Sequence, residues 1–207
     1  ARLRGLLLDH WRPVQLVFAG KSHPADDSGK ALIQQIYHLA KDPAFGGRIV
    51  FVEDYDMHVA RYFVQGCDLW LNNPLAPMEA CGTSGIKAAV NGVPSLSILD
   101  GWWEEGFNGA NGWAIGEAGG RDGGDAADAA DADDIYQALE KKIVPLFYDR
   151  GPDGVPHGWI KVMKESIKTV APRFCGNRMV KDYVKLFYGP EAAPQPRGDR
   201  TTAQVGT

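Results

Sequence analysis

The chain has 207 residues, of which 44% are hydrophobic and 23% are charged, as is typical of a globular protein with its own core. Its formal net charge of −4 gives no general attraction to nucleic acid or to an anionic membrane, and no apolar run approaches the roughly 20 residues that span a bilayer. Three widely spaced cysteines, Cys67, Cys81 and Cys175, argue against a disulfide framework and indicate a reducing cytoplasm.

Predicted strands and helices alternate through the first half of the chain. Apolar, β-rich runs predict strands at residues 14–19, 48–53, 69–71, 93–99 and 111–115. Helical spacing of apolar residues predicts helices at residues 28–41, 57–65 and 86–90, the first of them capped by Asp27 or Ser28. Because short connections join these elements, we expect parallel strands and a doubly wound, mostly parallel α/β sheet. Residues 53–55 and 72–84 follow strand ends, so they should line one ligand crevice.

The second half is predicted to be helical, apart from two polar segments. Helices are expected at residues 135–148, 157–170 and 177–188. Residues 117–134, rich in Gly, Ala and Asp, predict an acidic flexible loop whose last aspartates cap the next helix. The spacing of its aspartates lacks the calcium-loop pattern, so no metal site is expected. Residues 189–207 predict a disordered tail, which leaves 1–188 as the ordered domain.

The chain begins at Ala1, and residues 1–8 resemble the end of an amphipathic helix. This start indicates a fragment whose own domain continues upstream.

The segment Glu-Ala-Cys-Gly-Thr-Ser-Gly-Ile-Lys, residues 79–87, carries the chemistry of the chain. It lies between a predicted strand and a predicted helix, where free backbone N–H groups and the helix dipole suit an anion such as a phosphate. Lys87 follows one turn into the helix and has apolar neighbours, so a partly dry environment is expected to keep its amine available for Schiff-base chemistry. Glycine-rich turns of this kind are also common packing devices, and that structural interpretation stays open at this point.

The same segment resembles the pyridoxal-phosphate segment of the α-glucan phosphorylases, the family of glycogen, starch and maltodextrin phosphorylases. Further stretches resemble that family at residues 18–24, 51–56, 99–101, 111–116 and 171–183. The similarity extends over residues 12–188, with the acidic segment as an insertion, and favours the short bacterial-type branch. It implies a Rossmann-like C-terminal lobe of a two-lobed GT-B-type glycosyltransferase.

The resemblance implies that Lys87 carries pyridoxal 5'-phosphate as a Schiff base and that the cofactor's phosphate relays a proton. The residues implied around the cofactor are Tyr55, Gly82, Thr83, Ser84 and Gly85. Glu79 is implied to hold the hydroxyls of the reacting glucose, together with the backbone of Ala80, Cys81 and Gly82. Cys81 stands where the family usually has Ser, and Ile86 stands where it has Met.

The implied reaction is phosphorolysis of α-1,4-glucan by inorganic phosphate to give glucose 1-phosphate. The N-terminal lobe and a basic segment that binds the substrate phosphate are expected upstream of Ala1, so the fragment alone should be inactive. Which glucan is cleaved, and whether the protein forms an oligomer, stay open.

Two alternatives have the same fold. A retaining nucleotide-sugar glycosyltransferase would have Glu at position 87 to hold a ribose, and the ammonium of Lys87 cannot accept such a hydrogen bond. A non-catalytic lobe that binds glucan or a partner is the second alternative.

Three other features have open roles. Trp102 and Trp103 are expected either to line a sugar cleft or to pack against the lobe. His23 is expected to stabilise a loop, and Glu53 or Asp54 to cap the following helix.

Overall fold

The computed structural model describes residues 2–117, 121 and 123–189. All of the predicted tail except Gly189, and residues 118–120 and 122 of the predicted acidic loop, lie outside the described residues. The described part of the chain divides into two units, residues 1–171 and the segment from residue 172 onward.

Every described strand pair is parallel, which confirms the α/β class. The five described strands are β1 (Leu16–Ala19), β2 (Ile49–Val52), β3 (Trp70–Asn72), β4 (Ser95–Ile98) and β5 (Gly112–Ile115). They form two sheets, β1–β2 and β3–β4–β5, rather than the single continuous sheet that was predicted. In the larger sheet, Leu96 of β4 pairs with Leu71 and Trp113.

The predicted helices are all present with shifted boundaries, but the helix at Trp102–Gly106 was not predicted. The described helices are α1 (Arg2–Leu7), α2 (Asp27–Lys41), α3 (Met57–Gly66), α4 (Thr83–Val90), α5 (Trp102–Gly106), α6 (Asp125–Ala138), α7 (Val144–Tyr148), α8 (His157–Arg173) and α9 (Gly176–Tyr183). A 3₁₀ turn, η1 (Pro43–Phe45), and two π turns, η2 (Leu139–Ile143) and η3 (Val184–Tyr188), complete the assignment. The predicted cap of α2 is wrong, because the Asp26 carboxylate accepts from the Gly29 amide at 2.9 Å.

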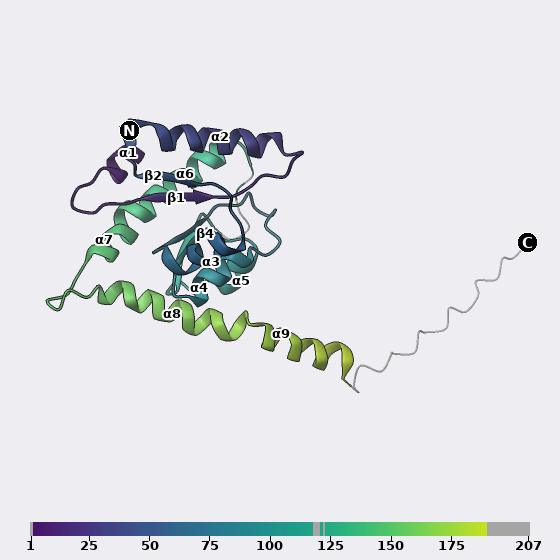
Figure 1. The fold of residues 1–207 in the computed structure, drawn as a ribbon. Helices are drawn as coiled ribbons and strands as arrows, with labels where there is room; N and C mark the ends of the chain where they lie inside the picture. Colours follow the sequence, from purple (N-terminus) through teal and green to yellow (C-terminus); the bar gives the residue numbers. More distant parts are fainter. Residues whose placement is uncertain (1, 118–120, 122, 190–207) are drawn as a thin grey trace, which may run out of the picture. The chain divides into compact units, whose positions relative to one another are not determined.

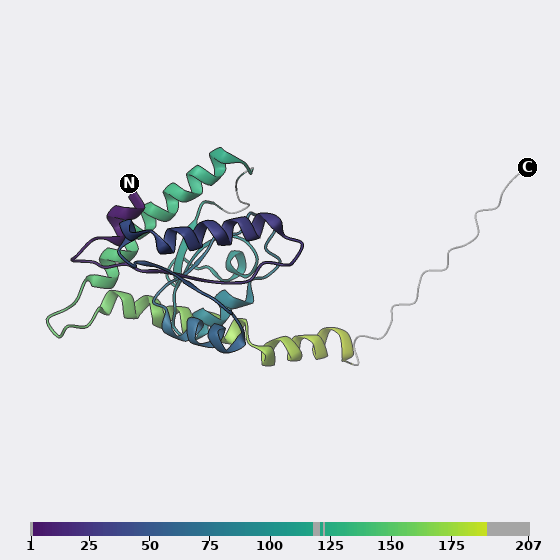
Figure 2. The same cartoon turned by 45° about the horizontal axis from the view of Figure 1, so that its top comes forward.

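The acidic segment is helical from Asp125 onward, so the prediction of a loop is wrong for residues 125–134. Alanine is the strongest helix former, and the aspartates near the start of α6 favour the helix dipole. Two guanidinium groups also hold its aspartates: Arg2 pairs with Asp133, and Arg121 pairs with Asp131. Figure 2 shows α6, η2 and α7 as one continuous helical run.

Helices pack against both sheets within residues 1–171. In Figure 1, α2 lies along the β1–β2 sheet, and α8 runs beside α4. The Ser166 hydroxyl of α8 donates to the Ala89 carbonyl of α4 at 3.3 Å. The largest core cluster lies around β4 and β5 and comprises Leu96, Ile98, Ile115, Ala138, Leu139, Ile143 and Trp159. A second cluster joins Val64 of α3 to Ala88 of α4.

Across the described residues, no helix is both long enough and apolar enough to span a membrane.

The second unit contains α9 and η3. The Cys175 sulfur caps α9 by accepting from the Arg178 amide at 3.5 Å, and Arg178 pairs with Asp182 one turn later. The helix predicted at residues 177–188 thus begins at Gly176 and changes to π geometry at Val184.

Replacing Leu96 with Ala should destabilise the protein by about 2–5 kcal/mol, since this fully buried side chain lies at the centre of the larger sheet. Leu32, on α2, is 59% exposed, and Leu32→Ala should change stability by less than about 0.5 kcal/mol. Urea denaturation of both variants measures the difference. Equal losses in the two variants would contradict the assigned core.

Candidate functional site

Residues 79–82, called here the Glu79 turn, are the last four residues of the connection between β3 and α4. The segments after β2 and β4 contribute Tyr55 and Asp100 at the corresponding strand ends. Parallel strands present their carboxyl ends at the same side of a sheet, so β3 and β4 end on the same side, whereas β2, which precedes Tyr55, belongs to the other sheet.

Helix α4 has one buried and one exposed face. Gly85, Ala88 and Ala89 are buried, whereas Thr83 and Lys87 are exposed. Positions 83 and 87 are four residues apart and therefore neighbour each other on the helix surface. The structure thus brings the Thr83 hydroxyl and the Lys87 amine to one open face. The expectation of a partly dry Lys87 is wrong for this chain, since the buried contacts of α4 lie on its other side.

The start of α4 suits an anionic group. Gly82 is the N-cap, with φ +80°, and no side chain of the described residues caps the helix. The amides of Thr83 and Ser84, the first two of the helix, have no intrahelical acceptor, and the hydroxyl-bearing side chains of both residues are exposed. Amides and hydroxyls donate hydrogen bonds of the kind that a phosphate group accepts. The Lys87 amine, one turn away, is the group that would react with an aldehyde on the same ligand.

The Glu79 carboxylate lies directly over the turn. A Cβ atom at Gly82 would overlap Glu79 Oε1, so a side chain at this position would displace that carboxylate. The Glu79 amide donates to Asp100 Oδ2 at 2.9 Å, which fixes the backbone at this residue. Glu79 is half-buried. Its side chain is therefore close to the start of α4, next to the groups predicted to hold a phosphate.

The two residues between Glu79 and Gly82 are exposed. The Cys81 carbonyl accepts from the Trp102 amide at 2.9 Å, so this oxygen is already engaged within the protein. A backbone contact from Cys81 to a ligand would therefore come from its N–H group. Cys81 forms no disulfide bond, and neither does Cys67 or Cys175.

Gly85 has a packing role that the sequence alone did not reveal. A Cβ atom at this position would lie 2.7 Å from Trp102 Nε1, and the Gly85 amide donates to the Gly82 carbonyl at 3.2 Å. The indoles of Trp102 and Trp103 are 3% and 0% exposed. Their burial favours the interpretation that this aromatic pair packs against the lobe over the interpretation that it lines a sugar cleft.

Tyr55 lies in the loop between β2 and α3. It is half-buried, and its ring meets Phe63 edge-on, with the two centroids 6.2 Å apart. The predicted cap at Glu53 or Asp54 is wrong, because the Asp56 carboxylate accepts from the Val59 amide at 2.8 Å. Asp54 instead adopts φ +54°, a left-handed conformation that turns the chain between β2 and α3.

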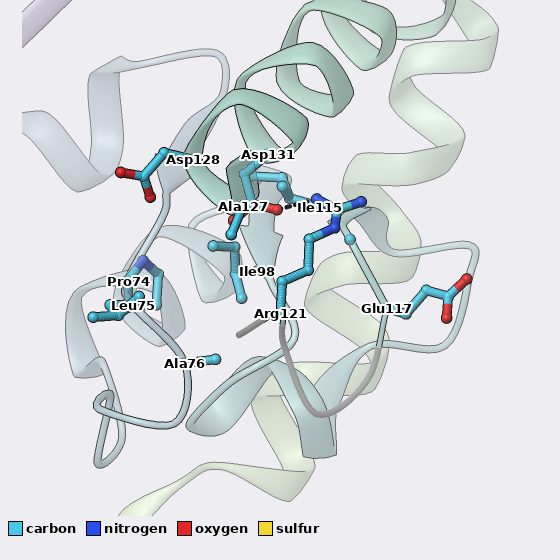
Figure 3. A pocket seen from close by; sticks show the side chains of 11 residues that line it. Pro74, Leu75, Ala76, Ile98, Ile115, Glu117, Arg121, Ala127, Asp128 and Asp131 are labelled. Carbon is cyan, nitrogen blue, oxygen red and sulfur yellow. Dashed lines mark hydrogen bonds and ion pairs between the residues drawn. The ribbon is translucent and has the colours of Figure 1, made fainter. Parts of the chain in front are cut away.

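A small pocket lies at the carboxyl ends of β4 and β5, beside the loop that leads into the Glu79 turn. Its lining includes Leu75, Ile98, Ile115, Arg121 and Asp131. Figure 3 shows Arg121 reaching to Asp131 across this pocket. Because aspartates of α6 already neutralise the guanidinium, the described lining residues offer no free cation to an anionic ligand. None of the predicted site residues is among these described lining residues.

The residues that hold the turn in place were missed as functional candidates. The sequence indicated Asp100 and Gly101 only as part of a motif that resembles the family. An Asp directly after a predicted strand is, however, a residue whose carboxylate can accept hydrogen bonds from backbone amides. His23 behaves as predicted, since its Nδ1 atom accepts from the Ala25 amide at 3.1 Å. Within the described residues, no cluster of His, Cys, Asp or Glu side chains could hold a metal ion.

Comparisons with known proteins find similarity to carbohydrate phosphorylases. The family model for carbohydrate phosphorylase matches residues 3–105. Glycogen phosphorylase of Aquifex aeolicus is 58% identical over 187 residues, which are 90% of this chain and 27% of that protein. Glycogen phosphorylase of Mycobacterium tuberculosis is 50% identical over 191 residues, which are 92% of this chain and 22% of that protein.

A third relative is maltodextrin phosphorylase of Thermococcus litoralis, 45% identical over 187 residues, which are 90% of this chain and 22% of that protein. The chain therefore spans roughly a quarter of the length of these relatives. A solved structure of Anabaena HepE in complex with UDP and glucose has a TM-score of 0.54 at 18% identity, covering 84% of this chain and 41% of that one. At this identity the likeness concerns the fold alone.

Replacing Gly85 with Ala should destabilise the protein by about 1–3 kcal/mol, since the new methyl group would overlap the buried Trp102 indole. A methyl group added at Gly66, the last residue of α3, would meet no other atom within 4 Å, so Gly66→Ala should cause no loss. Thermal unfolding of both variants distinguishes them. An unchanged melting temperature for Gly85→Ala would show that α4 does not rest on the indole.

Proposed function

The chain belongs to the carbohydrate phosphorylase family, and from that premise we propose that it is part of the C-terminal lobe of an α-glucan phosphorylase. The proposed reaction is phosphorolysis of α-1,4-glucan by inorganic phosphate, with glucose 1-phosphate as product. The observation that carries this proposal is the Glu79 turn with the uncapped start of α4, in a chain 58% identical to a glycogen phosphorylase over nine-tenths of its length.

Glu79 is the proposed acceptor for hydroxyl groups of the reacting glucose. A carboxylate can accept several hydrogen bonds, and each hydrogen bond to a charged acceptor contributes about 1.5–3 kcal/mol. The amides of Ala80, Cys81 and Gly82 are the proposed backbone donors to the same sugar. Because the Cys81 carbonyl already accepts from Trp102, this turn would present its N–H groups to the ligand.

Pyridoxal 5'-phosphate is the proposed cofactor, and it supplies a phosphate group that exchanges a proton with the substrate phosphate. Lys87 would hold it through the side-chain amine. Thr83 and Ser84 would donate hydroxyl hydrogen bonds to its phosphate, next to the first amides of α4. Gly82 and Gly85 would allow the phosphate to come close to the backbone at the start of α4. Gly85 would do so because it lets the helix pack directly against Trp102. Tyr55 is the proposed neighbour of the ring.

The complete activity requires more chain than these residues. The groups that bind the substrate phosphate, and a second lobe with further sugar contacts, are proposed to lie in the remaining length of the protein. The exposure of Lys87 and of the Glu79 turn fits this proposal, because the second lobe of a two-lobed enzyme would cover this face.

The alternative of a nucleotide-sugar glycosyltransferase is disfavoured by Lys87, whose ammonium cannot accept hydrogen bonds from a ribose. A non-catalytic glucan-binding lobe would not need an amine beside a phosphate site. Cofactor content distinguishes this alternative from the enzyme.

In the complete protein that contains this chain, Lys87→Ala should abolish retention of pyridoxal phosphate, because the amine that holds it is gone. Lys87→Arg should do the same, since a guanidinium keeps the charge without forming the bond. Near-ultraviolet absorbance of the purified protein measures the cofactor. Lys161→Ala, on the exposed face of α8, is the matched control and should keep full absorbance. Normal cofactor content in Lys87→Ala would refute the assignment.

Glu79→Gln should leave the cofactor bound and reduce kcat/KM for phosphorolysis by about 10- to 100-fold, because a neutral amide accepts weaker hydrogen bonds than a carboxylate. Release of glucose 1-phosphate from glucan measures the rate, and absorbance of the same sample measures the cofactor. Unchanged turnover would rule out the proposed sugar contact.

A further inference from the structure

We propose that Asp100 is a positioning residue, whose buried carboxylate fixes the Glu79 turn and thereby sets where the Glu79 carboxylate meets the sugar. This inference rests on the proposed function, because it concerns the group that would contact the reacting glucose. Asp100 itself touches neither substrate nor cofactor in this proposal.

Both oxygens of the Asp100 carboxylate are used by backbone amides. Oδ2 accepts from the Glu79 amide at 2.9 Å, and Oδ1 accepts from the Gly101 amide at 2.8 Å. Asp100 is only 8% exposed. Hydrogen bonds from N–H groups to a carboxylate are short and strong, and burial protects them from competition with water. The carboxylate therefore ties Glu79 to the end of β4.

The next two residues strengthen this attachment. The Trp102 amide donates to the Cys81 carbonyl at 2.9 Å. A Cβ atom at Gly101, which has φ +53°, would lie 2.7 Å from that carbonyl oxygen and 3.0 Å from the Glu79 oxygen. Residues 100–102 thus hold the Glu79 turn through the Asp100 carboxylate and through backbone contacts of Gly101 and Trp102.

The Glu79 carboxylate lies against Gly82, and a shift of the Glu79 backbone would carry this carboxylate with it. Misplacement of a substrate-contacting group by about 1 Å can reduce a rate by about a hundredfold. This geometry gives Asp100 a role in positioning Glu79, in addition to any contribution of Asp100 to stability.

The test uses Asp100→Asn in the complete protein. An amide of the same shape retains one acceptor and turns an NH₂ group toward the other backbone N–H, so one of the two hydrogen bonds is lost. The KM for glucose 1-phosphate, measured in the direction of glucan synthesis, should rise about tenfold or more. The KM for glucan and the absorbance of pyridoxal phosphate should stay unchanged.

Two further measurements distinguish a positioning role of Asp100 from a purely structural one. In a Glu79→Gln background, Asp100→Asn should raise the KM for glucose 1-phosphate by less than about twofold, since the two residues act through one contact. Asn111→Ala is the matched control: Asn111 is fully buried, and its Nδ2 donates to the Gly106 carbonyl at 2.8 Å, away from the turn. This control should lower the melting temperature without changing that KM.

If Asp100→Asn does not fold, Gly101→Ala displaces the same turn and should raise the same KM. An unchanged KM in the folded variant, or equal effects of Asp100→Asn with and without Glu79→Gln, would overturn the positioning role. A parent protein with no phosphorolysis overturns the proposed function instead, so the two failures are distinguishable.

Discussion

The contact between the Trp102 indole and Gly85 is the constraint on which the geometry of the candidate site depends. The indole occupies the space that a side chain at position 85 would need, so the first turn of α4 rests directly on α5. This contact decides which face of α4 is buried. Thr83 and Lys87 then take the open face, and the uncapped amides at the helix start lie beside them. The orientation of these groups therefore follows from the packing of one glycine, Gly85, against one aromatic ring.

Much of the strand order and the helix order could be predicted from local sequence patterns. Runs of apolar residues located all five described strands, because each strand contributes a short apolar segment to a core. The division into two sheets could not be predicted, since pairing between strands depends on geometry far along the chain. Capping residues were also misassigned by one to three positions. The cap depends on backbone dihedrals, and several neighbouring aspartates can supply the side chain.

Side-chain environments were harder to infer than elements. Composition suggested a loop for the acidic segment, but alanine propensity and ion pairs with Arg2 and Arg121 make most of it α6. The apolar neighbours of Lys87 suggested a dry amine. The alternation of small residues with Thr83 and Ser84 did contain the correct signal, because a helix places positions 83, 84 and 87 on one side. For Asp100 the local signal was its place after a strand end, which did not identify its partner, because Glu79 lies in the preceding strand–helix unit.

The hydrogen bond from Glu79 to Asp100 has a consequence for how this kind of protein can be divided. A piece of the chain that ends after α4 would retain every group with recognisable chemistry, from Tyr55 to Lys87. It would lack the β4 end, and with it the acceptor that holds the Glu79 backbone. A fragment of this chain that keeps the Glu79 turn in place therefore has to include β4 and to extend at least to Trp102.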